Sequence, residues 1–113
     1  MDCIFCNIVS GKIPGTIVYE NDHLLAFKDI YPEAPVHLLV IPKKHIQSLQ
    51  ELDPADKELA AELLPAIAQL AKEQGLAEDG YRVVTNIGEH GGQTVAHLHF
   101  HILGGRQLRW PPG

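Results

Sequence analysis

The stretch His97-Leu98-His99-Phe100-His101-Ile102-Leu103 decides how this chain is organised, because three of its seven histidines alternate there with apolar residues. Strict alternation predicts a β-strand, since successive side chains of a strand point to opposite faces. We expect the leucine, phenylalanine and isoleucine of this stretch in the core and the three histidines in a row on the other face. Neighbours on one face of a strand lie about 6.5–7 Å apart, so the three imidazoles could act on one small group.

A row of imidazoles suits nucleophilic attack, proton transfer or metal ligation, because unperturbed histidine titrates at about pH 6.5. Ordinary solvent-facing strands carry Lys, Glu, Thr and Ser, so a purely solvated face is the weaker interpretation. The main alternative is a metal site, since imidazole is a common zinc ligand. The pattern predicts a reactive site and leaves the choice between these chemistries open.

Length and composition indicate one globular domain over residues 1–113, with 45% apolar and 20% charged residues. No apolar run approaches the length of a membrane span, and no signal segment opens the chain, so we expect a cytoplasmic protein that binds no membrane. The net charge of −5, from 14 acidic and 9 basic residues, argues against long nucleic acid as a partner. A single nucleotide held by backbone amides is compatible with this balance.

The patterning along the chain predicts an α+β domain with an antiparallel sheet of about five strands. A short amphipathic helical turn should precede the sheet and end at Gly11. Besides the histidine stretch, runs of apolar residues bounded by turn residues predict strands at 17–20, 24–28, 37–41 and 81–87. The near-continuous apolar run of the 37–41 strand indicates a central position in the sheet.

One long helix is predicted from Asp53-Pro54 to about Gln74, with the aspartate as N-cap and the proline at the first helical position. Glu62 and Gln69 interrupt a largely apolar sequence and fall on one narrow stripe. A monomeric surface helix has a wider polar face, so we expect this helix to pack on its own sheet and on a partner subunit. The alternative is that the apolar surplus is mostly alanine and needs no partner.

A glycine-rich loop from Gly88 to Thr94 leads directly into the histidine stretch. Gly91 and Gly92 let the backbone approach a ligand, and consecutive amides in such a turn form an anion-binding nest. The Thr94 hydroxyl would add a further donor. A glycine pair alone is usually a hairpin turn, but here a bound phosphate would lie beside the imidazoles.

Further segments accompany the histidine stretch over essentially the whole chain. They are Ile4-Phe5, Phe27-Lys28-Asp29-Ile30, Val40-Ile41-Pro42-Lys43-Lys44-His45, Asn86, Gly91-Gly92-Gln93-Thr94, Gly104-Gly105-Arg106-Gln107 and Trp110-Pro111-Pro112-Gly113. Together with the His-x-His-x-His pattern they resemble the histidine triad superfamily, and specifically its Hint branch of histidine triad nucleotide-binding proteins. The resemblance implies a five-stranded antiparallel sheet with one long and one short N-terminal helix, dimerising through the long helix and a sheet edge.

The resemblance also implies a homodimeric purine nucleotide phosphoramidase that hydrolyses adenosine 5′-monophosphoramidates and acyl-adenylates, with no cofactor required for catalysis. The middle histidine of the triad, His99, would attack phosphorus and form a nucleotidyl-histidine intermediate that water hydrolyses. His101 would contact the phosphate or the leaving group, and His37 and His97 would orient the nucleophile.

A set of ligand-binding residues follows from the same resemblance. These are Asn86, Gly92, Gln93, Thr94, His99 and His101 at the phosphate or ribose, Asp29 at the ribose hydroxyls, Ile4, Phe5, Ile8, Phe27 and Ile30 around the purine, and Trp110 at the partner's site. Each of these residues could instead have a structural role, since apolar residues more commonly belong to the core and aspartate commonly caps a turn. Thr94 stands where serine is usual in the branch, and the hydroxyl is kept.

Cys3 and Cys6 depart from the members of the branch that lack cysteines here. Two thiolates and two imidazoles would complete a tetrahedral zinc site. Some bacterial relatives are similar in this respect, and the resemblance then adds His45 and His97 as the other two ligands. Such a zinc would be structural, leaving the middle histidine free. The alternative is that both thiols are small buried hydrophobes.

Two other functions stay open at this point. In the first, the three histidines of the triad bind a metal whose bound water is the nucleophile of a hydrolase. In the second, the chain is a nucleotide-binding scaffold for a protein partner, and residual activity is incidental.

Overall fold

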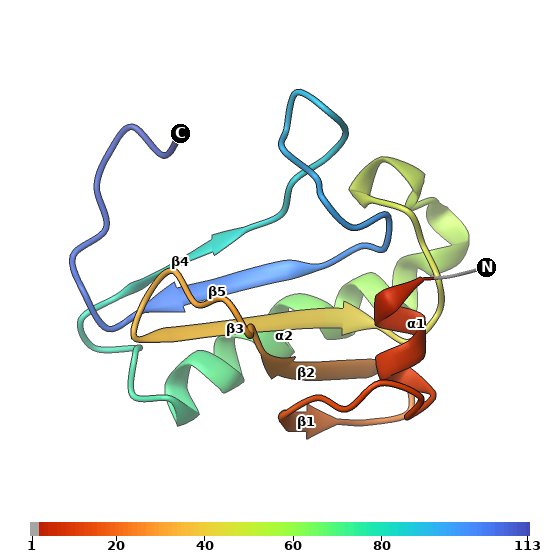
Figure 1. Cartoon of the computed structure of the whole chain (residues 1–113), viewed down its shortest axis with the longest axis horizontal. Coiled ribbons are helices and arrows are strands. Elements are labelled where there is room, and N and C mark those ends of the chain that lie inside the picture. Colours follow the sequence, from red (N-terminus) through yellow and green to blue (C-terminus); the bar gives the residue numbers. More distant parts are fainter. Residues whose placement is uncertain (1–2) are drawn as a thin grey trace.

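The computed structural model describes residues 3–113, and in this range the chain forms five strands, two α-helices and two short 3-10 helices (Figure 1). The elements are α1 (Ile4–Val9), β1 (Ile17–Glu20), β2 (Leu24–Lys28), β3 (Val36–Pro42), η1 (Leu49–Glu51), η2 (Pro54–Asp56), α2 (Lys57–Glu73), β4 (Tyr81–Val84) and β5 (Phe100–Gly104). All neighbouring strands pair antiparallel, in the order β1-β2-β3-β5-β4. The predicted α+β class is confirmed, as are the five-stranded antiparallel sheet and the two helices.

The two helices lie at opposite faces of the sheet, with α2 behind it in Figure 1 and α1 in front. This follows from the alternation of β3, whose Leu38 and Val40 face α2 while Leu39 and Ile41 face α1. Because both faces of β3 are covered, its apolar run is continuous, as the central position in the sheet requires. The α1 face carries the histidines discussed below.

The histidine stretch is a strand only in its second half, so the prediction of one continuous strand from His97 to Leu103 is wrong. β5 begins at Phe100, which pairs with Val40 of β3. Two residues beyond Val40 stands Pro42, which has no N–H to donate, so the ladder ends there. Leu98 instead donates its N–H to a carbonyl of the loop after β3, at 2.6 Å. The three histidines therefore do not form one row.

The fourth strand is also shorter than predicted, ending at Val84 rather than Ile87. Val84 pairs with His101, and the residues before β5 have left the sheet, so β4 has nothing further to pair with. The next residue, Thr85, uses its hydroxyl instead and donates to the carbonyl of His99 at 2.9 Å. This bond holds the backbone of the histidine stretch after the ladder has ended.

The long helix begins with a 3-10 turn and then continues as α2. Asp53 caps that turn by accepting the N–H of Ala55, and Asp56 accepts the N–H of Asp53 in return. α2 ends before Gly75, whose φ of +77° is the left-handed conformation that favours glycine. Within residues 3–113 no helix has the length and apolar character needed to cross a membrane.

Candidate active site

Five histidines gather on the α1 face of the sheet in two groups. We call His37, His99 and His101 the imidazole group. We call Cys3, Cys6, His45 and His97 the cysteine group. The ring of Phe5 in α1 contacts one member of each, edge to face, with centroid distances of 5.1 Å to His99 and 5.9 Å to His97.

One ring nitrogen of His99 is hydrogen-bonded to the backbone, and the other keeps its lone pair free. Its Nδ1 lies 2.6 Å from the main-chain carbonyl oxygen of His97. A carbonyl only accepts, so Nδ1 carries the proton and, in the neutral ring, Nε2 keeps its lone pair. The side chain is buried, with 4% of its surface exposed, and packs against Phe5. This arrangement presents an unprotonated imidazole nitrogen in a fixed orientation, as a nucleophile requires.

The hydrogen-bond partners also determine which ring nitrogen of His37 and of His101 carries the proton. The backbone N–H of Glu33 donates to Nδ1 of His37 at 3.0 Å, so the proton of the neutral His37 ring is on Nε2. That Nε2 lies 2.8 Å from Nδ1 of His101 and 3.3 Å from Oδ2 of Asp29. His101 therefore accepts at Nδ1 and carries its own proton on Nε2, where it is a hydrogen-bond donor.

His101 is uncharged at neutral pH. Burial is the main cause, and with the neighbouring His99 and His37 it lowers the pKa of His101 to about 4, while the carboxylate of Asp29 opposes the shift. The imidazole group thus combines a nitrogen lone pair on one ring with an N–H donor on the next, whose centroid is 5.1 Å away.

Steric constraints favour glycine at two positions of the loop before the histidine stretch. A Cβ on Gly91 would lie 2.3 Å from the carbonyl oxygen of Ile87, so only glycine fits. Gly92 has a φ of +76°, the left-handed region that other residues rarely adopt.

Gln93 holds this loop with its side chain. Its Nε2 donates to the carbonyls of Gln47 and Val95 at 2.7 and 3.0 Å, and its Oε1 accepts the N–H of Gly88 at 3.0 Å. Both of its amide hydrogens are therefore used within the protein. Thr94 is exposed and lines a cavity of about 450 Å³ near His45 and Ile4.

The apolar residues expected around a purine are only partly brought together. Phe5, Ile8 and Phe27 pack in one cluster on the α1 face. Ile4 is outside this cluster and lines the cavity beside Thr94. The remaining expected ligand residues are Asn86, which is half-buried after β4, and Ile30 and Trp110, which are about four-fifths exposed.

Asp29 has two roles in the structure. Its Oδ1 accepts the N–H of Tyr31 at 2.8 Å, which caps a turn, and its Oδ2 faces His37.

The cysteine group brings four potential metal ligands together. Sγ of Cys3 lies 3.3 Å from Nδ1 of His97, and Sγ of Cys6 lies 3.6 Å from the same atom and 3.3 Å from Nδ1 of His45. The four ligand atoms are all within 4.8 Å of one another. His97 donates from Nε2 to the carbonyl of Pro42 at 2.8 Å, so the lone pair of its Nδ1 faces the sulfurs.

This donor set fits a tetrahedral zinc ion. Zinc bonds of about 2.3 Å to sulfur and 2.0 Å to nitrogen give ligand–ligand edges of roughly 3.3–3.8 Å, the range of the three S···N distances above. Burial lowers the pKa of His97, which keeps the ring neutral as a ligand must be. Burial also raises the pKa of the Cys6 thiol, so thiolate formation there requires a nearby cation. The carbonyl of Pro42 is the kind of outer partner that orients metal-bound histidines.

A metal held by the three triad histidines does not fit this geometry. Nδ1 of His97 faces the thiols, and Nδ1 of His99 is bonded to a carbonyl. Asp29, His37 and His101 also offer atoms within 4.8 Å of one another, but a 2.8 Å hydrogen bond already joins the two rings.

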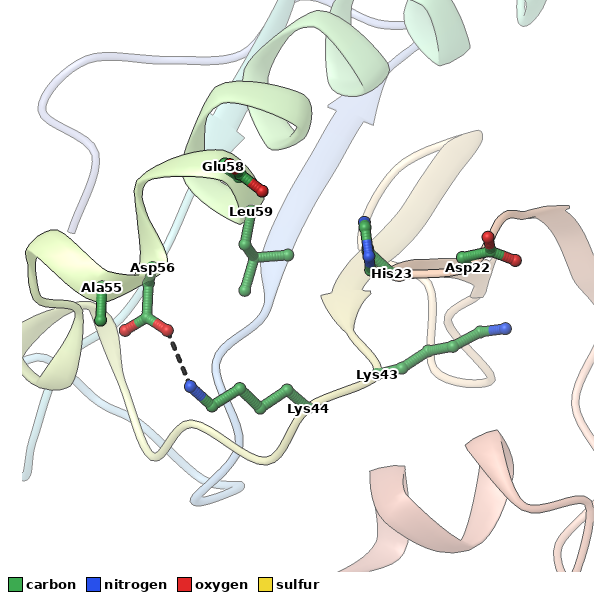
Figure 2. A pocket seen from close by; sticks show the side chains of 8 residues that line it. All are labelled: Asp22, His23, Lys43, Lys44, Ala55, Asp56, Glu58 and Leu59. Atoms are coloured by element: carbon green, nitrogen blue, oxygen red, sulfur yellow. Dashed lines mark hydrogen bonds and ion pairs between the residues drawn. The ribbon is translucent and has the colours of Figure 1, made fainter.

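A separate cavity of about 330 Å³ lies between the turn before β2, the end of β3 and the start of α2 (Figure 2). Its two lysines and its histidine each have an acidic partner. Lys44 bonds Asp56 at 2.8 Å, and Lys43 and His23 bond glutamates at 2.6 Å. The residues that line it belong to neither group of the candidate site.

Comparison with known proteins decides the family. The family model described as "Scavenger mRNA decapping enzyme C-term binding" matches residues 2–108. A HIT-like protein from Synechococcus elongatus is 53% identical over 112 residues, covering 99% of this chain and 97% of the relative. The chain belongs to the histidine triad superfamily. The resemblance drawn from the sequence is thus confirmed at the level of the superfamily.

Solved structures of histidine triad proteins have the same fold. A HIT family hydrolase from Legionella pneumophila is 52% identical, with a TM-score of 0.97 over 99% of this chain and 100% of the other. A histidine triad nucleotide-binding protein from Candida albicans is 34% identical, with a TM-score of 0.84 over 97% of this chain and 83% of the other.

Three groups that shape this histidine triad site were missed by sequence reasoning. They are the N–H of Glu33, the hydroxyl of Thr85 and the carbonyl of Pro42. Two of them act through the backbone, which residue type does not reveal. Thr85 falls inside a predicted strand, where threonine is ordinary.

Proposed function

We propose that this protein is a purine nucleotide phosphoramidase, which hydrolyses adenosine 5′-monophosphoramidates and acyl-adenylates through a nucleotide covalently bound to His99. The observation that carries the proposal is the 2.6 Å hydrogen bond from Nδ1 of His99 to the carbonyl of His97, which leaves the Nε2 lone pair free for attack. The similarity to a HIT family hydrolase and to a histidine triad nucleotide-binding protein supports the reaction class and the ligand class.

In the first step, Nε2 of His99 forms a bond to phosphorus while the P–N bond of the substrate breaks and the departing amine takes up a proton. The ring then carries a positive charge, which the carbonyl of His97 stabilises by accepting the Nδ1 hydrogen. In the second step, water attacks phosphorus, Nε2 regains its lone pair and one proton returns to solvent. The sum is the hydrolysis of one P–N bond by one water molecule.

The other residues of the site would orient and stabilise the substrate. The Nε2 hydrogen of His101 would bond an oxygen of the phosphate, since this neutral donor is beside the nucleophile. The N–H groups of Gly92 and Gln93 are bonded to carbonyls within their own loop, so the hydroxyl of Thr94 would be the loop's donor to the phosphate. Asp29 would accept the ribose hydroxyls with the carboxylate that faces His37.

Intact mass spectrometry after mixing with adenosine 5′-phosphoramidate tests this function. His101→Ala should slow turnover and accumulate protein heavier by one bound adenylate, with the modification mapping to His99. His99→Ala should show no such species. Turnover without any covalent adduct, abolished by a chelator, would instead indicate a metal-bound water as nucleophile and would end the proposal.

We also propose that the cysteine group binds a structural zinc ion. The support is the donor set, its distances and the neutral, oriented ring of His97. The ion would cross-link α1 to the loop after β3 and to the start of the histidine stretch. It would contact neither His99 nor His101, so the proposed reaction requires no cofactor.

We further propose that the protein is a homodimer, formed through α2 and β4. β4 is an edge strand and exposes Tyr81 and Val83, while α2 exposes Leu64 over 63% of its surface. An apolar edge strand beside an apolar helix stripe is a surface that soluble proteins normally cover.

The dimer is tested by Leu64→Glu in sedimentation velocity. We expect the dissociation constant to rise about 30-fold or more, because the charge would be buried at the interface. Ile17→Glu is the matched control, since Ile17 is an exposed apolar residue of β1, at the opposite edge of the sheet. Equal behaviour of the two variants would contradict the proposed interface.

A further inference from the structure

We propose that Arg106 is a positioning residue for the imidazole group. It holds Glu33, whose backbone N–H determines where the proton of His37 sits, and through His37 the proton of His101. The kinetic part of this inference rests on the proposed phosphoramidase function, whereas the part concerning ring protons does not.

The first link is between the segment after β5 and the connection from β2 to β3. Nη2 of Arg106 donates to the carbonyl of Glu33 at 2.8 Å, across 73 residues of sequence. The preceding residue, Gly105, lies so close to this connection that a Cβ there would be 2.9 Å from Cβ of Pro35. The hydrogen bond from the Arg106 guanidinium thus anchors the residue that contacts His37.

The second link is the amide of Glu33, which donates to Nδ1 of His37 at 3.0 Å. A backbone amide is a donor at any pH, so it stabilises only those states of His37 in which Nδ1 is unprotonated. Asp29 faces the other nitrogen, Nε2, and favours a proton there. Without the amide, only the longer 3.3 Å contact with Asp29 would favour this tautomer, and the ring could carry its proton on Nδ1 instead.

The third link is the 2.8 Å contact between Nε2 of His37 and Nδ1 of His101. With Nδ1 of His37 unprotonated, the His37–His101 pair carries no charge and His101 presents its Nε2 hydrogen beside His99. With the proton of His37 on Nδ1 instead, its Nε2 would accept, and His101 would have to donate from Nδ1 and present no Nε2 hydrogen beside His99. The exposed Arg106 therefore controls the tautomers of a pair that it does not touch.

The chain contains a matched control for this bond. Nη2 of Arg82 donates to the carbonyl of Arg109, also at 2.8 Å, and so ties the same terminal segment to β4. That bond has no connection to His37. Arg82→Ala removes the same kind of hydrogen bond and the same charge as Arg106→Ala without affecting the link to the imidazole group.

The test is ¹⁵N NMR of the imidazole rings in the full-length protein at neutral pH. In the wild type and in Arg82→Ala, Nδ1 of His37 should have the signal of an unprotonated nitrogen. In Arg106→Ala it should shift toward a protonated nitrogen, and in Glu33→Pro, which deletes the donor itself, it should shift further. An unchanged His37 signal in Arg106→Ala would overturn the inference, whether or not Glu33→Pro shifts it.

Kinetics with adenosine 5′-phosphoramidate provide the second readout. Arg106→Ala should lower kcat roughly 10- to 100-fold with little change in KM, as expected when a group that orients a catalytic side chain is lost. A shifted His37 signal with unchanged turnover would overturn the kinetic role of this pair. If no covalent adduct forms at His99 in the wild type, the proposed function is refuted instead.

Discussion

The imidazole group and the cysteine group use the same side chain in opposite ways. In His99 the backbone carbonyl is bonded to Nδ1, which leaves the lone pair on Nε2. In His97 the backbone carbonyl is bonded to Nε2, which leaves the lone pair on Nδ1, facing two sulfurs. Both rings are almost fully buried. The position of one carbonyl oxygen therefore decides which nitrogen is free, and with it whether the ring is suited to attack or to ligation.

The two groups are also joined by their surroundings. Cys3 is the N-cap residue of α1, and Cys6 and Phe5 belong to that helix. The phenylalanine contacts His97 on one side and His99 on the other. A metal ion at the cysteines would therefore stabilise a helix that also forms a wall of the imidazole group.

The largest expected difference between the groups is in turnover. His99→Ala should lower kcat/KM about 10⁴-fold or more, because it removes the nucleophile. His97→Ala keeps the carbonyl that orients His99, so it should retain far more turnover but lose about 2–3 kcal/mol of unfolding free energy from a buried site. Steady-state kinetics and urea unfolding of both variants measure this contrast. Equal losses of turnover in two folded variants would show that the groups do not differ as proposed.

A smaller difference is expected on removal of metal. Protein loaded with zinc at roughly 100 to 1,000 times its dissociation constant should lose about 3–4 kcal/mol of unfolding free energy when a strong chelator is added. The double variant Cys3→Ser/Cys6→Ser should bind no zinc by elemental analysis and show no chelator effect. A covalent adduct at His99 should still form in the chelated wild type. The same chelator shift in the double variant would rule out the cysteines as ligands.

The sequence predicted local features well and long-range ones poorly. The bounds of β1 and β2 agree with the prediction because Asn21-Asp22 provides a turn between two apolar runs. The end of α2 was also predicted from a local signal, the glycine at position 75. The point where β5 stops pairing with β3 was not predictable from local sequence, because it depends on Pro42 lying two residues beyond the partner of Phe100. That register joins segments about 60 residues apart and leaves no trace in the alternation of the histidine stretch.

The site was predictable to the same extent. The resemblance named the four residues of the cysteine group, and the structure brings them together. It also named the members of the imidazole group, but not which ring nitrogen of each carries the proton. Tautomers depend on the exact position of carbonyls and amides, such as those of His97 and Glu33, and residue identity does not encode these positions.

The smallest expected difference between the groups is in how stability depends on pH. The pKa of His101 is about 4 in the folded protein, against about 6.5 in an unfolded chain. Between these values the unfolded chain binds a proton that the folded protein does not, so stability falls as the pH drops from about 6.5 to 4 and this contribution falls no further below. The pKa of His97 is lowered as well, and its contribution to the slope is common to any variant that keeps this ring. In the presence of chelator, the urea midpoint of the wild type should therefore fall more steeply over this window than that of His101→Gln. Parallel curves for the two proteins would mean that His101 takes up a proton as readily in the folded protein as in the unfolded chain, which would contradict the lowered pKa of this buried ring.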